Sequence, residues 1–411
     1  MNITFLVGHL AKERHSLMYE LALDLGSKGN TVTVITGYPS RRISKDVQKY
    51  YQNHPTEQIS KNVRVVRVGS KRGEGNSLLI RMIKYLALTI HIYNHSKKLE
   101  TDAIYIYSTP PFLGLAGARL TKIAPTLYNA QDLFPDSLIK IKNLSERNLL
   151  VKLLRKLEEK IYKKNTKIIT ISEDMKKTII ESGVPADKVG VIHNWVDLDK
   201  VKNIPRSENI LFDKFKLDKE KFIISYAGDI GLFQNFDLIL KAAEKLQEDG
   251  FHDIEFVFIG NGSYQEELLK QISSRKLTNT KVFPLQPIEY ISHAYSLGDL
   301  EIVSLEKGMT RLALPSKIGQ IMAAGRPVLG IMDTDSVIAK EINEKKIGEV
   351  INKLDKQSLV DVILFFYNNQ EIVKEYGNNA REYALKNYNR AIQTNKYNKI
   401  LKEFVKEKDE N

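Results

Sequence analysis

The stretch that decides the fold is Leu314-Pro315-Ser316-Lys317-Ile318-Gly319-Gln320-Ile321-Met322-Ala323-Ala324-Gly325-Arg326-Pro327-Val328. Ser316 favours a helix start, and the small residues 323–325 let a helix pack closely on a sheet before the next strand. The first amides of such a helix point outward, so with Lys317 they can bind an anion. Gln320, one turn later, can hydrogen-bond vicinal hydroxyls. The stretch predicts a helix start that holds a diphosphate and a ribose.

Upstream of this helix, apolar runs alternate with helical patterns. The strands expected here are 222–228, 254–260, 282–283, 300–303 and 327–331. Ligands of such sheets bind at the carboxyl ends of the strands. Two loops there carry glycines that allow backbone amides to approach a phosphate, although glycines also simply end strands. The candidate positions are Gly228, Gly231, Gly260 and Gly262.

The first half of the chain repeats the alternation. Its expected strands are 3–7, 31–36, 63–68, 103–107, 125–128, 167–171 and 189–192. Strands separated by helices indicate a parallel, doubly wound sheet. The sequence therefore predicts an α/β protein of two Rossmann-like domains facing a central cleft, residues 1–200 and 201–387. The polar segment 197–221 is expected to link them, and a helix over about 388–411 to pack back on the first domain.

Composition excludes several classes of protein. The 411 residues contain no cysteine, so disulfides, thiolate metal sites and a cysteine nucleophile are excluded. The first residues indicate a strand rather than a signal peptide, and no apolar run is long enough to span a membrane. No histidine or carboxylate cluster has metal-ligand spacing. We expect a cytosolic protein without a metal.

The positive charge is confined to the first half. Residues 1–200 hold 32 basic and 19 acidic residues, a net charge of +13. The whole chain has a net charge of +12, so the remainder carries −1. This indicates an anionic partner, either a phospholipid surface or nucleic acid, unless the lysines serve only solubility. The membrane-facing candidate is 77–90, preceded by Arg64, Arg67, Lys71 and Arg72, with the basic helix 149–164 beside it. The alternative is that 77–90 is a core helix.

A series of motifs gives the chain a resemblance to a known family. They are Ser108-Thr109-Pro110-Pro111, Gln131-Asp132-Leu133-Phe134-Pro135-Asp136, Ser172, Asn194-Trp195-Val196-Asp197, the two glycine loops, and 315–328. In this order they resemble the family 4 glycosyltransferases of the GT-B fold, and look closest to the bacterial L-fucosamine transferase-like branch of O-antigen and capsule biosynthesis.

The resemblance implies a function. It implies retaining transfer of a sugar, such as N-acetyl-L-fucosamine or another N-acetylated hexosamine, from a UDP-sugar bound by the second domain. The acceptor would be a polyprenyl-diphosphate-linked saccharide held by the first domain, at the inner face of the cytoplasmic membrane. Neither a metal nor another cofactor is implied, and nucleic acid is not an expected partner.

The chain departs from the family pattern at acidic and basic positions. An acidic pair spaced E-x7-E falls on Leu312 and Gln320, unless Glu306 replaces the first member. A usual Arg and Lys fall on Asp229 and Gln234. The remaining cations for the diphosphate are Lys317 and Arg311, with Arg326 less favoured because it lies beyond the helix. A fixed cation there stabilises the departing nucleoside diphosphate.

Other candidates follow from their places in the pattern. Asp132 follows a strand and could orient or deprotonate the acceptor, with Gln131 beside it, or it could cap the next turn. Gly8 would approach the donor, and Pro315 and Ser316 would line its site. The backbone of Leu285 and Gln286 would contact the uracil. His9, Asn194 and Trp195 would shape the cleft, although Trp195 could equally be a packing anchor.

Two further patterns carry alternatives. Asp333-Thr334-Asp335 has the form of a metal-binding DxD motif, but Ser336 at a helix start favours capping. A nucleotide-sugar epimerase or hydrolase would explain the nucleotide site but not the basic first half. A nucleic-acid-binding protein would explain only the charge.

Overall fold

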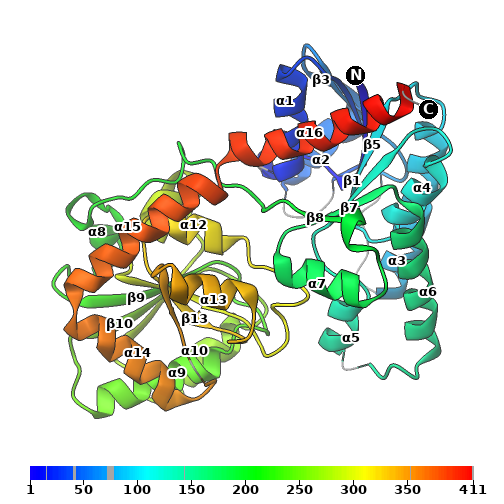
Figure 1. Cartoon of the computed structure of the whole chain (residues 1–411). Helices are drawn as coiled ribbons and strands as arrows, with labels where there is room; N and C mark the ends of the chain where they lie inside the picture. The colour runs from blue at the N-terminus through cyan, green and yellow to red at the C-terminus, as the bar shows by residue number, and fades with distance from the viewer. Residues whose placement is uncertain (15, 40–42, 72–77, 143, 352, 410–411) are drawn as a thin grey trace. The chain divides into compact units, whose positions relative to one another are not determined.

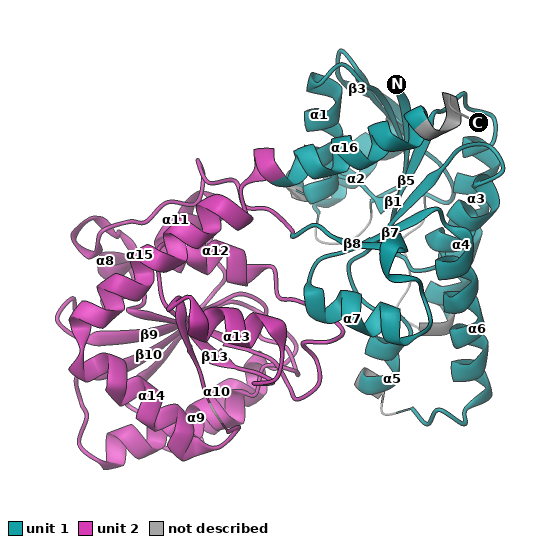
Figure 2. Cartoon of the chain, in the orientation of Figure 1, with its two compact units in different colours: residues 1–193, 393–411 teal, residues 194–392 magenta. Residues whose placement is uncertain are grey.

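The computed structural model describes residues 1–14, 16–39, 43–71, 78–142, 144–351 and 353–409. The chain forms two compact units (Figure 2). Unit 1 comprises residues 1–193 and 393–411, and unit 2 comprises residues 194–392. The predicted division lay after residue 200, so the chain changes unit seven residues earlier.

Unit 1 is built on an eight-stranded sheet in the order β3-β4-β2-β1-β5-β6-β7-β8. Only β3 runs antiparallel, pairing with β4. The strands are β1 (Asn2–His9), β2 (Thr31–Gly37), β3 (Thr56–Ser60), β4 (Val63–Arg67), β5 (Ala103–Tyr107), β6 (Thr126–Ala130), β7 (Lys167–Thr170) and β8 (Val189–Val191).

Alternating side chains of β5 show how this sheet is covered on both faces. Tyr105 points to Met18 and to Tyr397 of the last helix, whereas a Cβ on Gly117 of α4 would meet Ile106. Helices α3, α4 and α6 pack in a row on the Ile106 face (Figure 1). The helices of the unit are α1 (Leu17–Ser27), α2 (Lys45–Asn53), α3 (Leu78–Ser96), α4 (Leu113–Leu120), α5 (Asp136–Lys142), α6 (Leu149–Lys164), α7 (Glu173–Glu181) and the 3-10 turns Lys12–Arg14 and Ala186–Lys188.

Unit 2 carries a six-stranded sheet, all parallel, in the order β11-β10-β9-β12-β13-β14. The strands are β9 (Phe222–Ala227), β10 (Ile254–Ile259), β11 (Thr280–Phe283), β12 (Leu300–Ser304), β13 (Val328–Ile331) and β14 (Gly348–Val350). β9, β10, β12 and β13 are buried throughout, which is why their sequences are nearly continuous apolar runs.

The helices of unit 2 cover its sheet. The apolar sides of α9 and α14 meet side chains of β9 and β10 in one core, while α12 packs on α15 (Figure 1). The helices are α8 (Leu211–Phe215), α9 (Phe236–Glu248), α10 (Gln265–Ser274), α11 (Ile291–Tyr295), α12 (Lys317–Ala323), α13 (Val337–Glu344), α14 (Lys356–Asn368), α15 (Gln370–Asn387) and the 3-10 turns Arg206–Glu208 and Ile288–Tyr290. The last helix, α16 (Arg390–Asp409), begins in unit 2 and continues into unit 1.

The prediction that 197–221 is a linker is wrong. This segment belongs to unit 2, where Arg206 pairs with Asp299 and donates to the carbonyls of Lys219 and Lys221. Asn209 is buried and donates to the His293 carbonyl at 2.8 Å. Apolar side chains also attach the segment, since Leu211 and Phe212 are fully buried. The segment looks like a linker in sequence because these apolar residues are few and are grouped in the short helix α8.

Candidate active site

The strand order of unit 2 indicates where a ligand binds. β9 and β12 are neighbours, and the strands that follow each of them lie on opposite sides. Ligands of open α/β sheets bind beside the carboxyl ends of strands at such a reversal. The loops after β9 and β12 therefore carry the candidate site. They are joined, because the Glu306 amide donates to the Phe233 carbonyl at 3.0 Å and Asn235 Nδ2 donates to the Leu305 carbonyl at 2.9 Å.

The glycines after β9 and β10 allow two backbones to touch. A Cβ on Gly260 would overlap the Gly228 carbonyl, and one on Gly262 would overlap the Ile230 carbonyl. Gly228 has φ +143°, a conformation that side chains disfavour. Gly231 lies beside the side chains of Asp229 and Gln234. Gly260 and Gly262 are thus needed for loop packing, whereas Gly228 lies at the candidate site.

Lys317 lies at this point of unit 2. Its Nζ is 3.2 Å from the ring centroid of Tyr226 and would be 3.7 Å from a Cβ on Gly228. The residue is partly exposed, but the Nζ is buried and has no hydrogen-bond partner among the described residues. The ring is fixed because Tyr226 Oη donates to the Asp229 carbonyl at 2.6 Å. A desolvated, unpartnered ammonium beside a glycine is suited to an incoming anion.

A buried carboxyl group accompanies Lys317. Glu301, the second residue of β12, is fully buried and accepts from Ser225 Oγ of β9. Burial raises the pKa of Glu301 to about 8, and burial lowers the pKa of Lys317 to about 7, with the charges of Glu301 and Asp229 opposing that fall. Near neutral pH the pair therefore changes its protonation readily.

The helix α12 differs in part from the prediction. It begins at Lys317 and has only seven residues. Ser316 precedes it with helical backbone angles, and its side chain makes no cap hydrogen bond, so the expected side-chain cap is wrong. Ser316 is exposed, Pro315 is half-buried, and Gln320 lies half-buried one turn after Lys317. These three stay predicted donor-site residues, with the Ser316 hydroxyl not used as a cap.

Arg311 and the DTD motif lie together. The Arg311 guanidinium is 3.3 Å from Asp335, and both side chains are exposed. Asp333 accepts from the Gly308 amide at 2.8 and 2.7 Å and from Thr310 Oγ1 at 2.8 Å. Ser336 caps α13, as the sequence indicates. Asp333 therefore shapes the loop after β12. Among the described residues, no group of three or more histidine and carboxylate side chains could hold a metal ion.

The other residues predicted for the donor side, and the two cleft residues Asn194 and Trp195, are spread over unit 2. Leu285 is exposed, and Gln286 accepts from Lys214 Nζ at 2.8 Å. Asn194 and Trp195 are the first two residues of unit 2. Trp195 is buried, which fits the alternative that it is a packing anchor. Arg326 donates to the carbonyls of Ile204 and Ser296 at 3.1 and 3.0 Å, and is thus used to hold the segment that precedes β9.

In unit 1 the corresponding reversal lies between β1 and β5. A Cβ on Gly8 would overlap Pro110, so Gly8 is needed for the contact between the two loops that follow these strands. His9 ends β1 and is half-buried.

Gln131 and Asp132 follow β6 and differ in environment. Gln131 is buried, and its side-chain Nε2 donates to Asn129 Oδ1 at 2.9 Å. Asn129 Nδ2 in turn donates to the hydroxyls of Tyr105 and Tyr397 at 2.6 and 2.9 Å. Asp132 is exposed, yet desolvation by the surrounding protein raises the pKa of its carboxyl group. Asp132 is thus better placed than Gln131 to exchange a proton with a bound molecule.

Sequence reasoning missed Tyr226, Ser225 and Glu301 as parts of the site. Glu301 had a signal, because a glutamate inside an otherwise apolar strand must be paired or neutral. Tyr226 carried no comparable signal, since an aromatic residue in a buried strand is ordinary core.

Comparisons with known proteins match both halves of the chain. A family model described as Glycosyltransferase Family 4 matches residues 15–200, and one described as Glycosyl transferases group 1 matches residues 207–383. A protein of Pseudomonas aeruginosa described as "Probable glycosyltransferase WbjE" is 27% identical over 284 residues, 67% of this chain and 69% of that protein. "Putative colanic acid biosynthesis glycosyl transferase WcaI" of Escherichia coli is 30% identical over 159 residues, 38% of each chain.

Solved structures share the fold over almost the whole chain. Sucrose-phosphate synthase from Thermosynechococcus elongatus has a TM-score of 0.76 at 13% identity, covering 98% of each chain. HepE of Anabaena, in complex with UDP and glucose, has a TM-score of 0.70 at 16% identity, covering 98% of this chain and 100% of that one. The two α/β units define a protein of the GT-B fold. With both family models matched in order, the chain belongs to the family 4 glycosyltransferases and is a glycosyltransferase.

Proposed function

We propose that the protein transfers a sugar from a UDP-sugar, with retention of configuration and without a metal, to a polyprenyl-diphosphate-linked saccharide in bacterial surface polysaccharide synthesis. The observation that carries the donor part is the buried Nζ of Lys317, unpartnered among the described residues, at the strand-order reversal of unit 2. HepE, which shares the fold, has been solved with UDP and with UDP-glucose. WcaI is described by its role in colanic acid biosynthesis, which supports a polysaccharide product.

Lys317 would act on the leaving group. As the bond from the sugar to the diphosphate breaks, negative charge grows on the β-phosphate, and an ammonium at this point stabilises the transition state more than the bound donor. Gly228 leaves room for the phosphate because it lacks a side chain. Gln320, on the same helix, would bind the ribose hydroxyls. Asp132 of unit 1 would orient or deprotonate the acceptor hydroxyl.

The acceptor implies work at a membrane surface, here the inner face of the bacterial cytoplasmic membrane. No helix in the described parts of the chain is long and apolar enough to cross a bilayer. Helix α3 has two faces: Leu88 and Ile92 are buried, whereas Ile83 and Ile90 are 57% and 59% exposed. Helix α3 is thus a core helix that also exposes an apolar stripe, and the membrane-facing alternative for 77–90 stays a proposal. Residues 72 and 77 lie outside the described residues. With the basic charge of this half, the stripe supports peripheral contact with an anionic bilayer.

The donor proposal is tested by nucleotide binding. Thermal unfolding with UDP, GDP, ADP and TDP should show selective stabilisation by UDP, of about 2.7 kcal/mol at 100 times the dissociation constant. Lys317→Ala should weaken UDP binding and lower turnover by about 100-fold while the protein stays folded. Unchanged turnover in folded Lys317→Ala, or no response to any nucleotide, would refute the assignment.

A second assay separates transfer from the alternative activities. A transferase consumes the donor fast only when an acceptor is present, whereas an epimerase or hydrolase does not need one. Flotation with anionic liposomes at rising salt tests the membrane contact, and duplex DNA as competitor tests the nucleic-acid alternative.

A further inference from the structure

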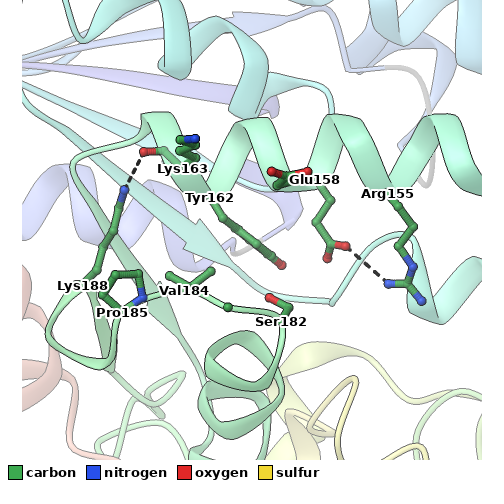
Figure 3. A pocket seen from close by; sticks show the side chains of 10 residues that line it. Arg155, Glu158, Tyr162, Lys163, Ser182, Val184, Pro185 and Lys188 are labelled. Atoms are coloured by element: carbon green, nitrogen blue, oxygen red, sulfur yellow. Dashed lines mark hydrogen bonds and ion pairs between the residues drawn. The ribbon is translucent and has the colours of Figure 1, made fainter.

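A pocket of about 680 Å³ lies in unit 1, between α6 and the segment that joins α7 to β8 (Figure 3). Its volume lies within the range of about 300 to 1,000 Å³ that is typical of small-molecule sites. The residues that matter for its chemistry are Arg155, Glu158, Tyr162 and Lys163 of α6, with Val184 and Lys188 opposite. None of them was assigned to sugar transfer above.

Local structure explains why the pocket exists. Residues 158 and 159 lie three and four positions after 155, and three or four positions before 162, so the four share one face of α6. Opposite, α7 ends at Glu181 with Ser182 as its C-cap, and Gly183 with φ +94° turns the chain so that Val184 and Pro185 stand away from the helix. The two walls are thus set by a helix face and a glycine-dependent turn.

One end of the pocket has no net positive charge, because carboxyl groups surround its arginine. The Arg155 guanidinium is paired with Asp136 at 2.6 Å, Glu146 at 2.9 Å and Glu158 at 3.3 Å, so its charge is compensated. Burial and the charge of Asp136 raise the pKa of Glu158 to about 7. Beside this group lies the buried side chain of Tyr162. This end suits an apolar or uncharged part of a ligand.

The other end carries two lysines, and the pocket lining also includes the exposed Glu159 one turn before Lys163. Lys163 is exposed on the rim, and Lys188 Nζ donates to the backbone carbonyl of Lys163 at 2.8 Å (Figure 3). The Lys188 ammonium is held by this hydrogen bond, and the Lys163 side chain is exposed to solvent. An anionic group is therefore favoured at this end.

The surroundings of the pocket are those of a lipid-contacting region. A hollow of only about 10 Å³ shares Glu158 and Tyr162 with it and is otherwise lined by apolar and aromatic side chains, among them Phe112 and Phe134. On the adjoining face of α6, Leu149 and Leu153 are 82% and 54% exposed. They lie among exposed Lys152, Lys156 and Lys160. Helix faces of this composition settle at the headgroup boundary of anionic bilayers.

We propose that this pocket binds an amphiphile with one apolar chain region and one phosphate group, the phosphate at Lys163 and Lys188 and the chain along Tyr162 and Val184. The inference does not rest on the proposed function, because a lipid can bind here whichever sugar is transferred. The same chemistry occurs in an isoprenoid phosphate and in a membrane phospholipid, and the experiment distinguishes the two.

The test uses calorimetry of the full chain with soluble probes below their micelle concentrations. Farnesyl phosphate represents the isoprenoid and dihexanoyl phosphatidylglycerol the phospholipid; farnesol and inorganic phosphate each lack one half of the chemistry. We expect at least one lipid to bind, about tenfold or more tighter than either half-probe. Binding of one lipid alone assigns the source, and binding of both assigns a general lipid site.

Variants locate the binding. Ser182→Trp fills the pocket from its exposed rim and should weaken lipid binding by about tenfold or more, and Lys163→Glu by about fivefold or more. Lys164→Glu makes the same charge change at the next exposed position, which does not line the pocket, and should stay within about twofold of the wild type. Thermal unfolding establishes that each variant is folded, and UDP binding gives an independent readout on unit 2.

Three results would overturn the proposal. They are no binding of either lipid to folded wild type, inorganic phosphate binding as tightly as the lipids, and Ser182→Trp and Lys163→Glu binding like the wild type. Failure of UDP binding with intact lipid binding would instead refute only the donor assignment.

Discussion

If Lys317 meets the diphosphate, as proposed, UDP binding should take up a proton. Burial lowers the pKa of Lys317 to about 7, so above pH 8 most of the free protein carries a neutral amine. A diphosphate beside the Nζ favours the charged ammonium and raises its pKa. The proton that restores the charge comes from the solvent when the nucleotide binds.

The size of this effect follows from the pKa. With a value of about 7, roughly 0.9 proton is taken up on binding at pH 8 and roughly 0.5 at pH 7, while the bound lysine stays charged. The apparent dissociation constant should therefore rise about 50-fold between pH 7 and pH 9. UDP itself contributes little at pH 8, because the last phosphate pKa is about 6.

Calorimetry in buffers of different ionisation enthalpy measures this proton directly. Lys317→Arg keeps a cation that does not titrate, so it should bind UDP without proton uptake and with little pH dependence. Glu301→Gln removes the other titratable group of the pair, so the difference from the wild type gives the part of the proton uptake that is due to Glu301. The reasoning is refuted if the wild type takes up less than about 0.2 proton at pH 8, or if Lys317→Arg takes up as much as the wild type.

Three further predictions concern stability and the acceptor side. Because the pKa of Glu301 is raised to about 8, the native state holds a proton that the unfolded chain loses, and the wild-type free energy of unfolding should fall as pH rises from about 4.3 to 8. In urea unfolding, the stability of Glu301→Gln relative to the wild type should therefore increase over this window. A difference that stays constant with pH would contradict the burial argument. Gly262→Ala should lower the free energy of unfolding by about 1 to 3 kcal/mol, since its Cβ would overlap the Ile230 carbonyl; a wild-type urea midpoint would show that the loops shift freely. Asp132→Asn should reduce transfer by about 100-fold and leave UDP affinity within about twofold, and an equal loss of both would move Asp132 to the nucleotide side.

The sheets could be predicted from the sequence because most of their strands are buried on both faces. Strands such as β9 and β10 are continuous apolar runs bounded by polar or glycine residues, and the structure has them at the expected places. β3 and β14 were missed. β3 is the antiparallel edge strand with a partly exposed, polar sequence, and β14 has only three residues.

The site was predictable in part. The position of Lys317 followed from a local pattern, Pro-Ser-Lys before small residues, but its buried Nζ depends on Tyr226, which is about 90 residues earlier in the chain. The missing cap at Ser316 depends on backbone angles that residue type does not fix. The pairing of Arg311 with Asp335 likewise depends on how two loops meet. Contacts between loops distant in sequence leave no local signal.

The route of the chain has a consequence for synthesis on the ribosome. Unit 1 contains Tyr397, whose hydroxyl accepts from the buried Asn129, together with Leu401 and Phe404, all buried on α16. These residues emerge after all of unit 2 has been made. Unit 1 is thus the first unit to begin and the last to be completed. Until α16 has been made, the nascent chain exposes the apolar surface that α16 covers, to which chaperones would bind, and the Asn129 side chain lacks its Tyr397 partner.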